Sequence, residues 1–187
     1  MAQFEPAFEI MMANEGGYKL TNDPVDRGGQ TYAGISRKAW PKWQGWYYID
    51  RGEIPPTQMV RGFYKTNFWD AVRGDTITDN RIASSIFNFA VNSGVKIAVK
   101  LAQIVVGVAP DGSIGEKTLA ALNASSPSIF IPNYTIAKIA RYRDIVKRDR
   151  TQIKFLLGWI NRLLRGCYES PVKYRNRRYS RNRWQGC

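Results

Sequence analysis

A single glutamate follows an apolar stripe near the start of the chain. Residues 4–14 have the spacing of an amphipathic helix, and on a wheel of about 100° per residue Glu15 lies about 20° from Phe4. The other apolar members of the stripe are Phe8, Met11 and Met12. A carboxyl held against apolar side chains at the C-terminal end of a helix is disfavoured as an anion, so its pKa rises. This predicts Glu15 as a general acid, with a structural glutamate paired to an arginine or to backbone N–H groups as the alternative.

Polar groups that could complete a hydrolytic site follow in a glycine-rich stretch. Asp26 comes eleven residues after Glu15, and Thr31 comes five residues after Asp26. Enzymes that cleave glycosidic bonds flank the bond with two carboxyl groups, of which one donates a proton and the other stabilises charge or activates water. A chain reversal would bring Asp26 opposite Glu15 across a cleft. The alternative is that Asp23 and Asp26 only form Asx-turns.

The elements that must position these groups are mostly helical. Gly16 and Gly17 are predicted to end the first helix, and turn signals within residues 20–36 predict a short β-hairpin or loop. Further helices are predicted at residues 57–69, from a cap at Asp79 to Gly94, and at residues 97–106, 115–123 and 134–164, the last as one long amphipathic helix. The predicted fold class is therefore mainly α, with a small N-terminal β-hairpin or loop lobe.

The charge balance is strongly basic. The 187 residues include 28 Lys and Arg against 15 Asp and Glu, a net charge of +13. Such a field attracts polyanions, including nucleic acid, anionic lipid and bacterial envelope polymers. Residues 166–187 form an Arg- and Tyr-rich tail, a composition found in binders of single-stranded nucleic acid and equally in solvated, non-specifically adhesive tails.

The chain offers few metal ligands and no membrane signal. It has no histidine, and its two cysteines, Cys167 and Cys187, both lie near the C-terminus, where they could pair. No zinc site is therefore expected, and a mechanism without metal or cofactor is favoured. No run of eighteen apolar residues predicts a transmembrane helix, and no basic segment followed by an apolar one predicts an ordinary signal peptide.

Four short motifs lie along the chain. The first is Glu-Gly-Gly-Tyr at residues 15–18, followed at 26–36 by the pattern D-x-G-G-x-T-x-x-G-I-S. The second is F-N-x-x-x-N-x-G at 87–94, the third is the turn and helix start at 107–119, and the fourth is G-W-x-N-R at 158–162. Together they resemble glycoside hydrolase family 108, the phage and prophage lysozymes of Gram-negative bacteria, and the third resembles a small peptidoglycan-binding module. The second departs from the family at Asn88, where Asp is usual.

The resemblance implies a lysozyme-like α+β fold and a division into three parts. Residues 1–94 would be the catalytic region, residues 95–165 a helical peptidoglycan-binding module packed on it, and residues 166–187 the basic tail. Glu15 would be the catalytic acid, with Asp26 and Thr31 managing charge and water. The expected substrate contacts are Tyr18, Tyr32 and Asn92.

The implied activity is that of an endolysin-type muramidase acting on peptidoglycan glycan strands. It would be made in the cytoplasm and reach the wall through a holin, lysis or dedicated export. The basic tail would hold it on anionic murein, membrane or lipopolysaccharide, whereas nucleic acid is not the expected partner. A non-catalytic murein-binding or secretion-assisting protein on the same fold is the alternative. Inversion or retention, hydrolysis or lytic transglycosylation, and oligomeric state stay open.

Overall fold

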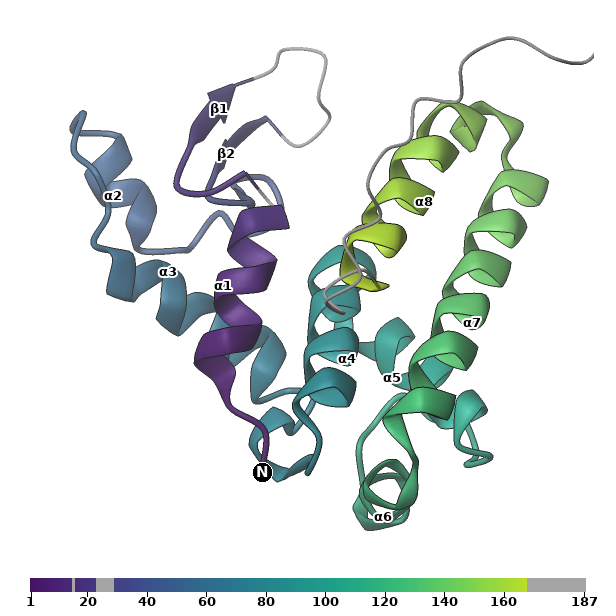
Figure 1. Cartoon of the computed structure of the whole chain (residues 1–187). Coiled ribbons are helices and arrows are strands. Elements are labelled where there is room, and N and C mark those ends of the chain that lie inside the picture. The colour runs from purple at the N-terminus through teal and green to yellow at the C-terminus, as the bar shows by residue number, and fades with distance from the viewer. Residues whose placement is uncertain (15, 23–28, 168–187) are drawn as a thin grey trace, which may run out of the picture.

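The structure, a computed structural model, describes residues 1–14, 16–22 and 29–167, with no side-chain description for residues 14 and 165–167 (Figure 1). The N-terminal part contains α1 (Phe4–Asn14), β1 (Leu20–Asn22), β2 (Gln30–Tyr32), β3 (Ile35–Ser36), α2 (Gly45–Ile49), α3 (Thr57–Tyr64), the π-helical turn η1 (Lys65–Trp69) and the 3-10 turn η2 (Gly74–Thr76). The remainder contains α4 (Asn80–Ser93), α5 (Val95–Val105), α6 (Glu116–Ala124), α7 (Pro127–Arg148), the 3-10 turn η3 (Arg150–Gln152) and α8 (Ile153–Cys167). The predicted class, mainly α with a small β lobe, is confirmed.

Helix α4 lies at the centre of the fold. It contacts α1 on one side and α5 and α7 on the other, while the small sheet, α2 and α3 lie beyond α1 (Figure 1). The stripe predicted on α1 is buried, with Phe8 and Met11 at most 1 % exposed. Phe4 meets Phe87 of α4 edge-on at 6.0 Å. Each fully buried side chain of this size stabilises the fold by about 1.5–3 kcal/mol.

The start and end of α4 follow from its sequence. Asp79 is in extended conformation and accepts hydrogen bonds from the backbone N–H groups of Arg81, at 2.8 Å, and Ile82, at 3.3 Å. The helix ends at Gly94, whose φ of 86° is readily adopted only by glycine. The capped helix predicted between Asp79 and Gly94 is therefore confirmed.

The single helix predicted over residues 134–164 is wrong. Helix α7 begins earlier, at Pro127, and ends at Arg148, and the chain then reverses into α8. Asp149 is extended, with φ −137° and ψ 100°, and its carboxylate accepts the Thr151 N–H at 3.0 Å. Because this aspartate caps a new helical start, two packed antiparallel helices replace one long helix.

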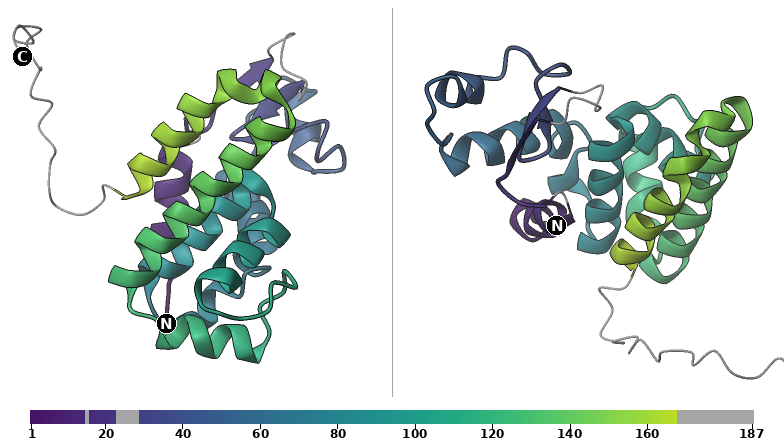
Figure 2. Two further views of the ribbon diagram at one scale, coloured as in Figure 1. Left: turned by 90° about the vertical axis from the view of Figure 1, so that its right-hand side faces the viewer. Right: turned by 90° about the horizontal axis from the view of Figure 1, so that it is seen from above.

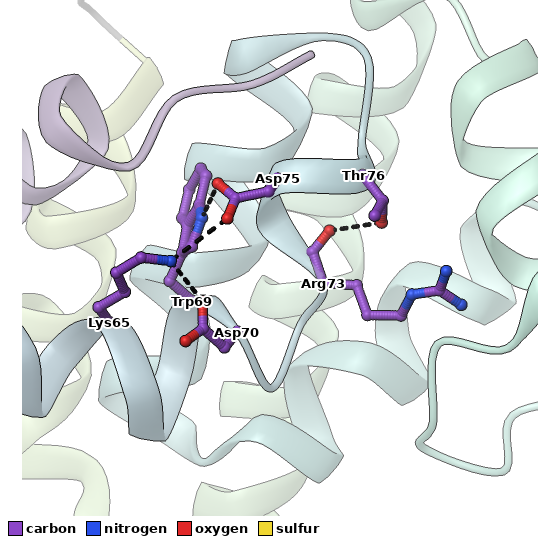
Figure 3. Close-up of polar contacts among 6 residues, drawn as sticks. All are labelled: Lys65, Trp69, Asp70, Arg73, Asp75 and Thr76. Atoms are coloured by element: carbon purple, nitrogen blue, oxygen red, sulfur yellow. Dashed lines mark hydrogen bonds and ion pairs between the residues drawn. The ribbon is translucent and has the colours of Figure 1, made fainter.

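A polar cluster holds the segment between α3 and α4 (Figure 3). The Lys65 ammonium donates to Asp70 Oδ1 at 2.7 Å and to Asp75 Oδ2 at 3.2 Å. The indole N–H of the fully buried Trp69 donates to Asp75 Oδ1 at 2.7 Å. This indole donation, assisted by Lys65, holds the pKa of Asp75 below its usual value. The contacts fix the Trp69 ring against the chain that leads into α4.

Candidate active site

Two glycines form the turn at the C-terminal end of α1. Gly16 has φ 84° and Gly17 has φ 77°, and the Gly17 N–H donates to Met12 O at 3.0 Å. This six-residue bond is that of a Schellman motif, which ends a helix through a residue in left-handed conformation. The predicted helix stop at Gly16 and Gly17 is therefore confirmed, and the chain leaves α1 towards the small sheet.

Tyr64 of α3 connects α1 to the sheet. Its ring lies 6.0 Å from that of Phe8, and its buried hydroxyl donates to Ala33 O at 2.8 Å. Ala33 and Gly34, with φ 49° and 80°, form the two-residue turn between β2 and β3. Since the same tyrosine contacts both elements, the position of β2 relative to α1 is fixed by packing.

The antiparallel sheet, of order β1-β2-β3, places Thr31 and Tyr32 on opposite faces. Thr31 is half-buried and pairs with Thr21 of β1, and its hydroxyl is 3.5 Å from Gly29 O. Tyr32 is only 4 % exposed, and its ring stacks on Trp43 at 6.1 Å. Of the two residues, Thr31 is therefore the one accessible to solvent.

Tyr18 follows the glycine turn and remains 40 % exposed. Partial burial raises the pKa of its phenol, and the charges of Glu9 and Tyr32 add to the increase. Tyr18 therefore stays neutral at physiological pH and presents an aromatic surface beside β1.

Asn92 lies in the last turn of α4 and connects two of the sequence motifs. Its amide Nδ2 donates to Asn88 O at 3.0 Å, and its Oδ1 accepts a hydrogen bond from Arg162 of α8 at 2.6 Å. The neighbouring Ser93 hydrogen-bonds Tyr142 of α7. The α7–α8 hairpin is thereby attached to the C-terminal end of α4. Sequence analysis did not select Arg162 as a site residue, although the G-W-x-N-R motif pointed to it.

Arg37 is a second residue that sequence analysis did not select. It donates to Gln30 Oε1 at 2.7 Å and to both carboxylate oxygens of Asp50 at 2.5 and 2.6 Å, and it lies over the Trp46 ring at 5.0 Å. Hydrogen bonds from Arg37 hold the pKa of Asp50 below its usual value. Arg37 thus attaches β2 to α2, and no sequence spacing signals this contact.

The predicted acid and its partner, Glu15 and Asp26, lie outside the described residues, as do the side chain of Cys167, all of Cys187 and the tail from residue 168 onward. The structure therefore places Tyr18, Thr31 and Tyr32 in the lobe that contains the small sheet. It places Asn92 at the C-terminal end of α4. In the described ranges, no group of three or more Asp, Glu, Cys or His side chains is arranged to hold a metal ion. No helix in these ranges is long and apolar enough to span a bilayer.

Comparison with known proteins identifies two matching families. The glycosyl hydrolase 108 model matches residues 8–94, and the model of a predicted peptidoglycan domain matches residues 97–164. Among solved structures, SagA of Brucella abortus is similar, with 29% sequence identity and a TM-score of 0.69. The match covers 87% of this chain and 90% of that one. No curated protein matches the chain in sequence.

The matches agree with the resemblance seen in the sequence motifs. The hydrolase match includes α1 from residue 8 onward, the small sheet and α4, whereas the peptidoglycan match includes the α7–α8 hairpin up to residue 164, with Arg162. The chain therefore carries a glycosyl hydrolase 108 segment followed by a predicted peptidoglycan domain, and it is a lysozyme-like protein that acts on peptidoglycan.

Proposed function

We propose that the protein is a muramidase that hydrolyses the β-1,4 bond between N-acetylmuramic acid and N-acetylglucosamine. The observation that carries this proposal is the geometry around α1. The buried apolar stripe of α1 is followed directly by a Schellman turn. Packing through Tyr64 holds the half-buried Thr31 of β2 in the same lobe. The segment that contains this stripe matches the glycosyl hydrolase 108 model, and we assign the role of proton donor to Glu15, which follows the stripe in the sequence.

In this proposal, Glu15 protonates the oxygen that leaves when the glycosidic bond breaks. Asp26 stabilises the positive charge that develops on the sugar ring, and Thr31 helps to hold the attacking water. Tyr18 offers its exposed ring to a sugar face. Tyr32 supports the sheet from its buried side. Asn92 offers its side chain to the glycan strand at the C-terminal end of α4.

The proposed organisation assigns catalysis to residues 1–94 and wall binding to residues 95–165, with residues 166–187 as a basic tail. The net charge of +13 supports adhesion to anionic wall polymers, with an affinity that falls as salt increases. An enzyme of this kind suits the endolysin role, in which it reaches the periplasm after holin release, lysis or export.

Digestion of purified Gram-negative murein, followed by mass spectrometry of the fragments, tests this function. We expect fragments that end in reducing N-acetylmuramic acid, because water is the acceptor. Fragments with 1,6-anhydro ends would instead identify a lytic transglycosylase. Binding to murein without release of any fragment would favour the alternative of a non-catalytic wall-binding or secretion-assisting protein.

The contact between Asn92 and Arg162 predicts that these two residues, one in each matched segment, stabilise the fold cooperatively. A double-mutant cycle with Asn92→Ala and Arg162→Ala should give a coupling free energy of about 0.5–1 kcal/mol, since one charge-assisted hydrogen bond at a partly exposed position is lost. Unfolding in urea by fluorescence measures each variant. The cycle isolates this pair from the other contacts of Arg162. If the losses of unfolding free energy in the two single variants simply added up in the double variant, the coupling would be contradicted.

A further inference from the structure

Within the described residues, the α7–α8 hairpin has one side that packs on the rest of the fold and one side that is exposed. On α8, Arg162 reaches Asn92 of α4, and Trp159 stacks on Tyr142 of α7 at 4.9 Å. By helical periodicity, three aliphatic residues of α8 lie about 140–180° from Arg162, on the side away from α4. They are Ile153, Leu157 and Leu164, and all are exposed.

Helix α7 contributes two exposed isoleucines to the same side of the hairpin. Its buried Tyr134 donates to Ala98 O of α5 at 2.9 Å, and its buried Lys138 donates to the Ser85 hydroxyl of α4 at 2.9 Å, so these residues mark the inner side of the helix. Ile136 lies about 160° from each of them and Ile139 about 100° from Lys138. Both isoleucines are exposed.

The two helices run side by side, as the left view of Figure 2 shows. Their exposed aliphatic residues therefore share what we call the outer face of the hairpin: Ile136, Ile139, Ile153, Leu157 and Leu164, each between 41 and 71% exposed. A cluster of large aliphatic side chains left exposed to solvent marks a surface that contacts something apolar.

Basic side chains surround the outer face. Residues 134–164 contain eight Lys and Arg, of which Lys138 and Arg162 lie on the inner side, and two acids, Asp144 and Asp149. Arg143 and Lys147 are exposed on the same side of α7 as Ile136, and Lys154 is exposed on α8 next to Ile153. Asp144 is already paired with Arg143 at 2.8 Å, and Asp149 is used as the cap between the helices.

We propose that the outer face docks on the surface of an anionic phospholipid bilayer. Such a surface offers phosphate charge to the basic side chains and acyl chains to the aliphatic ones, which is the chemistry that interfacial amphipathic helices use. A second copy of this chain would bring equal positive charges together across the interface. Glycan strands would leave the aliphatic side chains without an apolar partner.

Docking in this way has a consequence for orientation. Arg162 and Asn92 lie on the side of α8 opposite to the aliphatic stripe, so they face away from the lipid. The protein would rest on the membrane with the C-terminal end of α4 directed towards the wall. The inference concerns membrane docking, and it stands or falls separately from the proposed hydrolysis.

Co-sedimentation of the full chain with vesicles tests the proposal. Vesicles of phosphatidylcholine with one quarter phosphatidylglycerol are compared with pure phosphatidylcholine. The variant Ile153→Ser/Leu157→Ser should bind the anionic vesicles about tenfold or more weakly than the unchanged chain, because two aliphatic side chains lose their burial in lipid. Lys147→Glu/Lys154→Glu should weaken binding to the anionic vesicles and decrease the salt sensitivity of what remains, because fewer charge contacts are left for salt to screen.

The matched control is Ile54→Ser/Ile104→Ser, which removes two exposed isoleucines away from the hairpin. It should bind as the unchanged chain does, and thermal unfolding verifies that every variant is folded. Equal vesicle binding by the Ile153→Ser/Leu157→Ser variant would overturn the proposal, because the basic tail alone would then account for adsorption. A dimer of the unchanged chain that this variant converts to monomer would also overturn it.

Discussion

Replacing Glu15 with Gln should abolish the release of reducing ends from murein, lowering turnover by about 10²–10⁴-fold. The amide has the same shape as the carboxyl but cannot donate a proton to the leaving oxygen. Loss of function should therefore occur without loss of stability. A reducing-sugar assay on purified murein measures the rate, and circular dichroism with thermal unfolding measures the fold.

Glu9→Gln is the matched control for this experiment. Glu9 lies on α1 and is exposed, and it forms an ion pair with Arg61 at 3.4 Å. A solvent-exposed pair of this kind contributes little, so activity and stability should both be close to those of the unchanged protein. If a well-folded Glu15→Gln protein digested murein at the full rate, the assignment of the proton donor would be wrong.

Replacing Gly74 with Ala should destabilise the protein by about 1–3 kcal/mol, with a Tm lower by roughly 3–10 °C. A Cβ at this position would lie 2.3 Å from the Trp69 ring, far inside van der Waals contact. The ring cannot move aside easily, because it is fully buried and its N–H is bonded to Asp75 (Figure 3). Thermal and urea unfolding measure the effect.

Gly62→Ala provides the comparison for this substitution. Gly62 lies within α3, and a Cβ there would have no neighbour within 4 Å. Alanine is the better helix former, so this variant should be as stable as the unchanged protein or more stable, by up to about 1 kcal/mol. Equal stabilities of the two variants would contradict the role given to the contact between Gly74 and Trp69.

Elements with a local start and stop were predictable from the sequence. Helix α1 has its apolar stripe and its two terminating glycines, and α4 has Asp79 at its start and Gly94 at its end. In both cases side-chain chemistry within a few residues decides the boundary, so tertiary context is not needed.

The break between α7 and α8 was missed because apolar residues continue at helical spacing on both sides of it. Asp149 followed by Thr151 was a local signal for a new helix start, but the long apolar periodicity outweighed it. Strand periodicity places Thr31 and Tyr32 on opposite faces, yet only the packing of Trp43 shows which face is buried.

Contacts between distant segments could not be predicted at all. Asn92 and Arg162 are 70 residues apart, and their hydrogen bond depends on how the α7–α8 hairpin packs on α4. The contact between Arg37 and Asp50 likewise depends on the path of an aromatic-rich connection. A motif can mark such residues, but only the three-dimensional packing identifies their partners.

The reversal at Asp149 determines where the last part of the chain is attached. A straight helix over residues 134–164 would be about 46 Å long and would carry its C-terminal end far from α4. Because the chain turns back, α8 ends at Cys167, about 8 Å along the helix axis from Arg162 and therefore near Asn92. The described part of the chain thus ends close to the hydrolase segment, so a polymer bound by the residues that follow would be held near that segment at a local concentration above that in bulk solution.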